Sequence, residues 1–280
     1  KTSLAMNLVE NASLRAGKTC AVFSLEMPRS EIVQRLICSY ANVSMAKALA
    51  GTLNAKEWKK LILASDRLKK SKIYIDDSSR VTPAEILSKC RRLKTTAGGV
   101  DLIMIDYIQL MSSGDSKMAG AENRQQEVAS ITRDLKIMAK ELGVPVIALS
   151  QLKRIQSKEP QLSDLRESGA IEQDADIVLF IHKEEVSGVM KYSLIVAKHR
   201  NGEQGKIELF WLGKIVRFVD AEYLTQHGIN MGQVVETVVD DNVQQPDDDL
   251  SFGESIGDFS ELEDGGFVDL SGDDIPETQE

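Results

Sequence analysis

The segment VDLIMIDYIQL, Val100–Leu110, decides the fold that we expect for this chain. It follows two glycines, is almost entirely apolar and is rich in isoleucine. A short run of this kind, bounded by turn residues, is typical of a strand that is buried on both faces of a parallel sheet. Asp106 stands near the carboxyl end of the run, which in an open α/β sheet is the edge where ligands bind. Its carboxylate fits two interpretations, the cap of a turn and a Walker B aspartate that orients Mg²⁺ on a bound nucleotide.

Helical and strand-like patterns alternate on both sides of this central run. Helices are predicted over residues 3–17, 31–41, 53–68, 83–95 and 122–142. Strands are predicted over residues 19–25, 72–76, 144–149, 176–182, 192–198 and 206–212. Ser30, Asn54 and Thr82 are expected to cap the helices that follow them. The alternation indicates a doubly wound α/β fold with a mostly parallel sheet and helices on both faces. Short turns between the last strands predict an antiparallel edge.

The net charge of −9 conceals two segments of opposite sign. All 34 Lys and Arg residues lie at or before Arg217, whereas 18 of the 43 acidic residues lie after it. A basic body suits a polyanionic partner, although the same charge also serves solubility alone. From about Asp240 the sequence is rich in Asp, Glu, Gly and Ser, and this composition predicts disorder. We therefore divide the chain into a folded domain over residues 1–222 and an acidic tail over residues 223–280.

Apolar runs and cysteine spacing limit the class of protein further. No run approaches the ~18 apolar residues of a transmembrane helix, and the first residues show no signal-peptide pattern. Cys20, Cys38 and Cys90 have no metal-ligand spacing, so we expect buried free thiols in a cytoplasmic protein. The sequence opens at Lys1, inside what reads as a motif, and we expect it to be a fragment of a longer protein.

Lys1-Thr2 matches the end of the phosphate-binding pattern G-x-x-x-x-G-K-[ST]. In that pattern the lysine reaches the β- and γ-phosphates and the hydroxyl binds Mg²⁺. The dipeptide is a weak signal by itself, but it opens a predicted helix and has Asp106 downstream. Glu26 follows the predicted strand over residues 19–25, at the same sheet edge as Asp106. A carboxylate there fits a base that positions the attacking water in nucleotide hydrolysis, or a solvated strand end.

Polar residues also follow two later strands. Gln151 stands after VPVIALS, where it either senses a γ-phosphate or caps a turn. Lys198 and Arg200 end the strand YSLIVA, and because one residue separates them, their side chains should point the same way. They fit a pair of cationic fingers that reach the nucleotide of a neighbouring subunit, or a solvated basic turn.

The polar stretch over residues 153–174 has no clear periodicity and contains Arg166, Glu167 and Gly169. An arginine and backbone N–H groups on a loop suit the gripping of a phosphate chain without base reading. An ordinary surface loop is the alternative interpretation.

In combination these segments resemble one protein family. From Lys1 to about Val219 the chain is similar to the C-terminal, RecA-like motor domain of the DnaB family of bacterial replicative DNA helicases. The motifs that carry the resemblance occur in the order KTSLAMN, FSLEM, VTPAEI, LIMIDYIQLM, VPVIALSQLKR, LRESGAIEQDADIV and AKHRNG. The resemblance implies a RecA-like fold and a homo-hexameric ring around single-stranded DNA. Such a ring moves 5′ to 3′ and unwinds duplex DNA while it hydrolyses ATP, with Mg²⁺, between subunits.

The resemblance implies roles for residues around the nucleotide. Lys1 and Thr2 would be the end of the Walker A motif, and Asp106 would be the Walker B aspartate. Thr2 and Asp106 would reach Mg²⁺ through the nucleotide. Glu26 would be the catalytic base that polarises water, and Gln151 would couple nucleotide state to movement.

Other implied roles concern DNA and partner proteins. Lys198 and Arg200 would be fingers that act on the neighbouring subunit's nucleotide. Arg166, Glu167 and Gly169 would lie in the loop that holds the DNA backbone. A primase and a helicase loader are the protein partners that the resemblance implies, and no membrane is involved.

Two features depart from the family pattern, and two other functions compete with this one. The phosphate-loop glycines, the strand before them and the family's N-terminal collar domain are absent from this sequence, so the fragment alone is expected to be inactive. The acidic tail is not part of the motif set. Another RecA-like ATPase, such as a recombinase or mediator, is disfavoured by LRESGAIEQDAD and KHR. A non-hydrolysing replication scaffold is disfavoured because Glu26 and Arg200 are both present.

Overall fold

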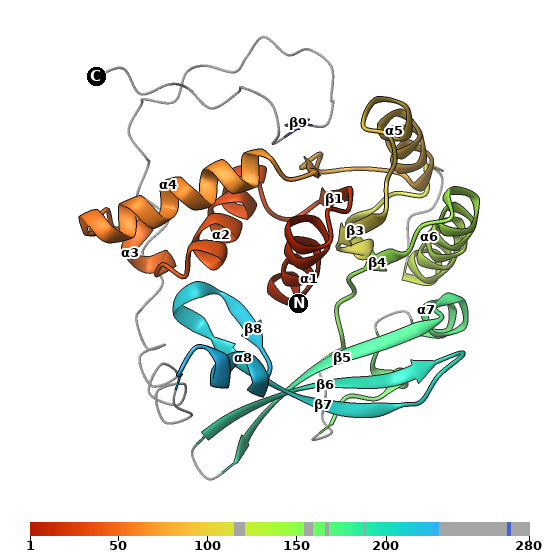
Figure 1. The fold of residues 1–280 in the computed structure, drawn as a ribbon. Coiled ribbons are helices and arrows are strands. Elements are labelled where there is room, and N and C mark those ends of the chain that lie inside the picture. The colour runs from red at the N-terminus through yellow and green to blue at the C-terminus, as the bar shows by residue number, and fades with distance from the viewer. Residues whose placement is uncertain (115–120, 154–158, 166–167, 187–188, 230–267, 270–280) are drawn as a thin grey trace.

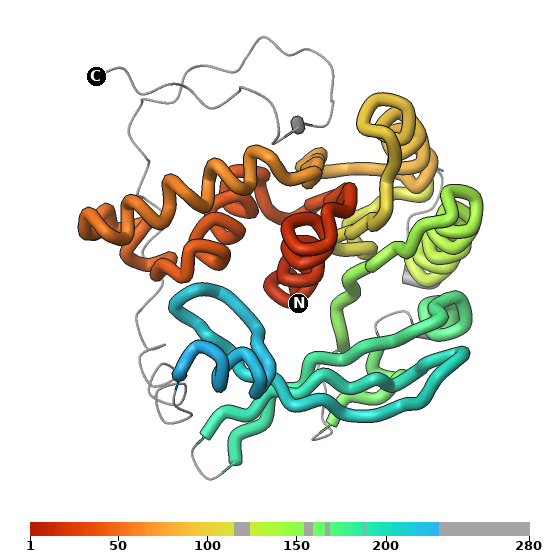
Figure 2. Tube along the Cα trace, viewed as in Figure 1, coloured from red at the N-terminus to blue at the C-terminus, as the bar shows by residue number. Residues whose placement is uncertain are grey.

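The computed structural model describes residues 1–114, 121–153, 159–165, 168–186, 189–229 and 268–269. In these ranges a parallel sheet is covered by helices, and a second, antiparallel sheet lies beside it (Figure 1). The chain trace in Figure 2 shows that the segment coloured from red to light green builds most of the parallel sheet with its helices. The second sheet comes from the later part of the described chain. The predicted α/β class is therefore confirmed.

The parallel sheet has the strand order β4-β3-β1-β2-β9. Its strands are β1 (Cys20–Ser24), β2 (Ile73–Asp76), β3 (Leu102–Asp106), β4 (Val146–Ala148) and β9 (Val268–Asp269). Strands β1 to β4 pair in parallel, and β9 pairs antiparallel with β2. All of β3 is buried, as expected for the centre of the sheet. The register places Ser24 of β1 beside Asp106 of β3, so these two strands end at the same level.

Helices pack on both faces of this sheet. They are α1 (Thr2–Glu10), α2 (Arg29–Ala41), α3 (Met45–Leu49), α4 (Ala55–Lys69), α5 (Pro83–Thr96) and α6 (Ala121–Leu142). Cys20 and Val22 of β1 join a core with α1, α2 and α4, whereas Ala21 and Phe23 join a core with α5 and α6. Successive residues of a strand face opposite sides, which is why a strand with two buried faces must be apolar throughout.

The structure confirms the predicted N-caps of two helices and corrects a third. Asn54 and Thr82 cap α4 and α5, and each forms the predicted type of capping box. The prediction that Ser30 caps α2 was wrong. This helix already begins at Arg29, and its N-cap residue is Pro28, which is itself in an extended conformation.

The antiparallel strands form a sheet of their own in the order β5-β6-β7-β8. They are β5 (Ile177–Val186), β6 (Val189–His199), β7 (Gly205–Leu212) and β8 (Arg217–Val219), followed by α8 (Ala221–Gln226). Helix α7 (Ser168–Asp174) precedes β5, and sequence periodicity did not predict it. In Figure 1, α7 lies between α6 and the ends of β5 and β6.

The structure corrects one predicted strand and describes the predicted tail only in part. The apolar run VPVIAL predicts a buried strand. That prediction was wrong, because among the described strands β4 pairs only with β3 and is partly exposed. The predicted tail lies outside the described residues except for its first residues and β9. Helix α8 spans the domain boundary that we placed between residues 222 and 223. None of the described helices combines the length and apolarity needed to span a bilayer.

Candidate functional site

The candidate site lies where β1, β3 and β4 end. The backbone N–H of Leu25 donates to the Asp106 carbonyl over 2.8 Å, which joins the ends of β1 and β3. The N–H of Leu149 donates to the Ile105 carbonyl over 2.9 Å, which joins the ends of β3 and β4. The residues that follow these three strands are therefore neighbours, as the sequence analysis expected of a parallel sheet.

Thr2 and Asp106 are in direct contact at this edge. The Thr2 hydroxyl donates to Asp106 Oδ2 over 2.6 Å, and this bond joins the first residue of α1 to the last residue of β3. Asp106 is 1% exposed, and its other carboxylate oxygen, Oδ1, has no hydrogen-bond partner among the described residues. A buried charged oxygen without a donor is costly, so its position suits a cation or a donor supplied by a ligand.

Lys1 belongs to the same group of charges. Burial lowers the pKa of the Lys1 side chain, and the carboxylates of Asp106 and Glu26 act in the opposite direction. The Lys1 ammonium also lies 5.1 Å from the centre of the Tyr107 ring. Tyr107 follows Asp106 through a cis peptide bond. The structure thus brings together Lys1, Thr2, Asp106 and Glu26, although they are far apart in the sequence.

Glu26 and Gln151 flank this group. Glu26 lies two residues beyond the end of β1 and is exposed, so its carboxylate is accessible to a water molecule. Gln151 lies three residues beyond the end of β4, and its backbone N–H donates to the side chain of Gln109 over 3.3 Å. The same Gln109 side chain donates to Ser150 over 2.8 Å. Gln109 was not singled out from the sequence, although it belongs to the central run and fixes the loop that carries Gln151.

The residues at this edge fit a magnesium nucleotide better than a metal ion bound by protein alone. The described residues contain no cluster of three or more His, Cys, Asp or Glu side chains that could hold a metal. Mg²⁺ on a nucleotide needs only one or two protein oxygens, because phosphates and water supply the rest. The Thr2 hydroxyl and the unpaired Oδ1 of Asp106 are oxygens of this kind, and Lys1 adds the cation that phosphates require.

Lys198 and Arg200 lie on the other sheet, at the end of β6. The Lys198 ammonium donates to the backbone carbonyl of Glu172 in α7. The Arg200 guanidinium pairs with Asp176 over 3.1 Å. Lys198 therefore contacts α7, and Arg200 contacts the residue just before β5. Among the described residues no hydrogen bond or ion pair joins either side chain to Lys1, Thr2, Glu26 or Asp106.

The predicted DNA-holding residues are only partly described. Gly169 is exposed in the first turn of α7, and space is open around its α-carbon. Arg166 and Glu167 lie outside the described residues. The prediction for this loop therefore stays a prediction.

A buried ion pair that the sequence did not reveal joins the second sheet to α1. Arg217 of β8 pairs with Glu10 of α1 over 2.9 Å, and their side chains are only 8% and 3% exposed. The Phe218 backbone N–H donates to the Asn7 side chain over 2.9 Å. Burial raises the pKa of Glu10, and Arg217 opposes that effect. These contacts fix the last short strand against the helix that begins with Thr2.

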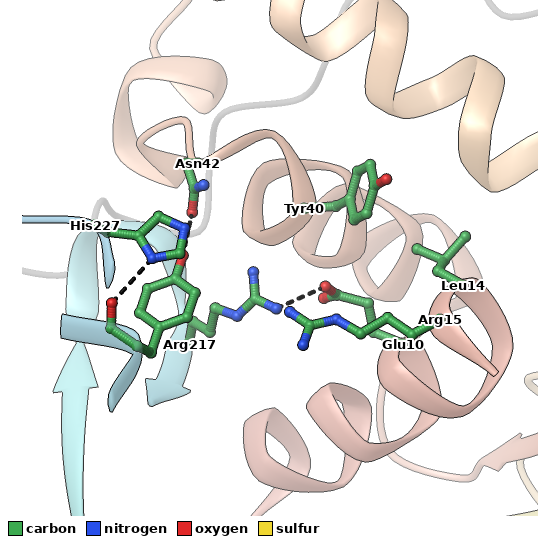
Figure 3. Close-up of a pocket in the computed structure, with 8 residues that line it drawn as sticks. Glu10, Leu14, Arg15, Tyr40, Asn42, Arg217 and His227 are labelled. Atoms are coloured by element: carbon green, nitrogen blue, oxygen red, sulfur yellow. Dashed lines mark hydrogen bonds and ion pairs between the residues drawn. The ribbon is translucent and has the colours of Figure 1, made fainter. Parts of the chain in front are cut away.

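A cavity of about 250 Å³ opens beside this ion pair (Figure 3). Arg15 extends along its wall next to the Glu10 carboxylate, and Tyr40 and Asn42 come from the end of α2 and the residues after it. His227, after α8, stacks on Tyr223 with ring centres 3.9 Å apart. The cavity lies at the opposite end of α1 from Lys1 and Thr2, so it is separate from the candidate nucleotide site.

Comparisons with known proteins agree on one family. Residues 1–220 match the family model described as the DnaB-like helicase C terminal domain. The replicative DNA helicase DnaC of Bacillus subtilis is 43% identical over 232 residues, which cover 79% of this chain and 50% of that protein. The replicative DNA helicase DnaB of Haemophilus influenzae is 45% identical over 231 residues, which cover 78% and 48%. This chain thus spans about half the length of these relatives.

Solved structures give the same picture. A structure described as an ATPase domain superposes with a TM-score of 0.72 at 35% identity, over 79% of this chain and 80% of that domain. A DnaB-like replicative helicase, studied with its primase interactions, superposes with a TM-score of 0.71 at 35% identity, over 78% of this chain and 54% of that one.

Proposed function

Because this chain belongs to the DnaB-like helicase C-terminal domain family, we propose that it is the ATP-hydrolysing motor of a replicative DNA helicase. The observation that carries the proposal is the contact between Thr2 and Asp106, with the unpaired Oδ1 of Asp106 and the Lys1 ammonium beside it. A hydroxyl, a carboxylate and a cation at one sheet edge are what a magnesium triphosphate requires.

In this proposal Lys1, Thr2 and Asp106 bind ATP and Mg²⁺. Lys1 neutralises phosphate charge, while Thr2 and Asp106 supply oxygens for the cation that accompanies the nucleotide. The magnesium ion, when bound, withdraws charge from the phosphates. The hydrogen bond between Thr2 and Asp106 orients both oxygens before the nucleotide arrives, so little rearrangement is needed on binding.

Glu26 is the base that orients the attacking water. Its side chain is exposed, and it lies close enough to Lys1 to raise the pKa of the Lys1 ammonium. Gln151 stands at the third strand end, where its side chain reports the state of the γ-phosphate to the loop that Gln109 holds. Lys198 and Arg200 serve the nucleotide of a neighbouring subunit, which accords with their separation from the site of their own chain.

The wider proposal is a homo-hexameric ring that moves 5′ to 3′ along single-stranded DNA in the cytoplasm. Arg166, Glu167 and Gly169 would grip the DNA backbone. A primase and a loader would be its protein partners, and a solved relative was studied with primase. Residues 1–222 would form the motor domain, and the acidic residues 223–280 would form a separate tail.

The test uses the full-length protein and two variants, Lys1→Ala and Arg200→Ala. Each variant alone should lose DNA-stimulated ATPase activity, because one lacks the phosphate-binding cation and the other lacks the finger. In mixed rings, a Lys1→Ala subunit can offer its intact Arg200 to a neighbour whose nucleotide site is intact. Mixing should therefore restore part of the activity. Absence of rescue at every mixing ratio would exclude fingers that act between subunits.

A non-hydrolysing scaffold is the competing function, and the same assay separates the two. Full-length protein that binds ATP but shows no turnover with single-stranded DNA would establish the scaffold. Turnover that single-stranded DNA accelerates would establish the motor.

A further inference from the structure

Arg200, the proposed finger, pairs with the carboxylate of Asp176. Asp176 has no role in the proposed nucleotide site of its own chain. Asp176 stands between α7 and β5, and its Oδ1 forms an ion pair with Arg200 Nη1 at 3.1 Å. The Arg200 backbone N–H also donates to the Asp176 carbonyl over 2.9 Å. The side chain and the backbone of Arg200 are thus fixed by the same residue.

Asp176 is itself fixed from the opposite side. Its second oxygen, Oδ2, accepts a hydrogen bond from the ammonium of Lys136 on α6. The hydrogen bond from Lys136 is the main reason that the pKa of Asp176 lies below its usual value, so the carboxylate stays charged. Thr132, one helical turn earlier on α6, donates to the side chain of Asp174 over 2.7 Å. The same face of α6 therefore holds two carboxylates at the end of α7 and the start of β5.

Helix α6 makes this support rigid. Its residues Val128, Ile131, Leu135 and Met138 are buried in the core that packs on the parallel sheet. A continuous series of contacts consequently runs from that core through Lys136 and Asp176 to the tip of Arg200.

Arg200 keeps the capacity to bind a further anion while Asp176 holds it. A guanidinium has five N–H donors in one plane, and only one of its terminal nitrogens faces Asp176. Asp176 is shared with Lys136, so one negative charge faces two positive charges and the local charge stays positive. The side chains of Arg200 and Asp176 are both 52% exposed, which leaves the guanidinium accessible to a neighbouring molecule.

We propose that Asp176, supported by Lys136, is a positioning residue that holds the Arg200 guanidinium in place for the nucleotide of the neighbouring subunit. Arginine loses considerable rotational freedom when it is ordered at an interface. Asp176 imposes this order before subunits and nucleotide meet, so that the finger is preorganised for the transition state. The inference rests on the proposed function, because it requires Arg200 to act between subunits.

The experiment compares Asp176→Ala with Asp176→Glu in the full-length protein. Removal of the carboxylate should lower the kcat of DNA-stimulated ATP hydrolysis about fivefold, the upper end of the range expected for loss of one exposed ion pair. The KM for ATP should stay within twofold, because Lys1, Thr2 and Asp106 are unchanged. Asp176→Glu should recover part of the lost kcat. A kcat for Asp176→Ala within twofold of the wild-type value would overturn the proposal.

A mixing experiment shows where the defect acts. Rings that contain both Asp176→Ala and Lys1→Ala subunits should regain activity, because the Lys1→Ala subunit contributes a correctly held finger. If Arg200→Ala is rescued by Lys1→Ala but Asp176→Ala is not, Asp176 acts only inside its own subunit and the positioning role is refuted. If Arg200→Ala itself has no effect, the proposed function fails independently.

Two further variants distinguish a specific effect on kcat from a general loss of folding. Lys136→Met leaves Asp176 and Arg200 intact but removes the support, and it should lower kcat in the same direction as Asp176→Ala. Glu141→Gln breaks the pair between Arg91 and Glu141, whose side chains are 61% and 40% exposed. It is the matched control and should leave kcat unchanged. A Lys136→Met variant that folds and has wild-type kcat would contradict the role of Asp176 even if Asp176→Ala does not fold.

Discussion

Substitution of Arg217 by methionine tests how the second sheet is held on α1. The change removes a guanidinium that is almost completely buried and leaves the Glu10 carboxylate, 3% exposed, without its main partner. Removing one member of a buried ion pair costs about 3–5 kcal/mol. Glu10 still accepts from the Ser39 hydroxyl over 3.3 Å, and Arg15 remains nearby. We therefore expect the lower part of that range, about 3 kcal/mol of unfolding free energy.

A double variant separates the effect of an unpaired buried charge from the effect of lost packing. The double variant Glu10→Gln with Arg217→Met removes both charges and keeps a hydrogen-bonding side chain beside Ser39. It should be more stable than Arg217→Met alone, because no unpaired charge remains buried. Arg91→Met, which removes an exposed ion pair, is the control and should change stability by less than about 1 kcal/mol.

The loss of unfolding free energy in Arg217→Met should also depend on pH. Burial raises the pKa of Glu10, and removal of Arg217 raises that pKa further. The folded variant therefore binds a proton at pH values where the unfolded chain does not, so its stability falls as pH rises through this interval. The difference between Arg217→Met and the wild type should be largest at neutral pH and should narrow toward about pH 4, the usual range of a glutamate.

Thermal and urea unfolding measure these effects directly. For a domain of this size, about 3 kcal/mol corresponds to a decrease in Tm of roughly 6–12 °C. The reasoning is refuted if Arg217→Met shifts Tm no more than Arg91→Met does. It is also refuted if the double variant is no more stable than the single variant, because the two residues would then be energetically independent.

Three further predictions follow from other sites. Glu26→Gln should abolish ATP hydrolysis in the full-length protein and leave binding of a fluorescent nucleotide analogue largely intact, and normal turnover would remove Glu26 from the role of base. Asp76→Asn should cost about 1.5–3 kcal/mol at pH 7, because it leaves the partly buried Lys89 without its charged hydrogen-bond partner. Burial alone raises the pKa of Asp76, but the hydrogen bonds from Lys89 and Ser78, together with the charge of Lys89, lower it overall. The stability that the charged Asp76 contributes is therefore lost as pH falls through the lowered pKa, and urea melts of variant and wild type should converge below about pH 4. Burial raises the pKa of the Cys20 and Cys90 thiols to about 12, so a thiol reagent at pH 8 should modify neither in the native protein and both in urea.

The sequence predicted those parts of the fold that depend on local patterns. The central strand, the caps Asn54 and Thr82, and the arrival of Asp106 and Glu26 at one edge all follow from apolar runs and the geometry of parallel strands. The contact between Thr2 and Asp106 required the tertiary fold, but the phosphate-binding pattern already pointed to both residues. Their catalytic roles stay predictions that the proposed experiments address.

Other features have no local signal. Helix α7 is short and polar and contains Gly169, and it is held by contacts such as the one between Thr132 and Asp174 rather than by its own periodicity. The edge position of β4 depends on its pairing, which its apolar sequence does not encode. No spacing rule connects Glu10 with Arg217 or Asp176 with Arg200, because their proximity arises only when the sheets are assembled.

The pairing of Glu10 with Arg217 has a consequence for the synthesis of the protein. The two residues are separated by 207 positions, so the ribosome adds Arg217 about 10–40 s after Glu10 at ordinary translation rates. During that interval Glu10 lacks its ion-pair partner Arg217, and α1 cannot bury this face at full stability. A nascent chain that stops before β8 thus keeps a weakened α1 and is open to proteolysis. Synthesis of β8 is therefore the step that completes the contact with α1.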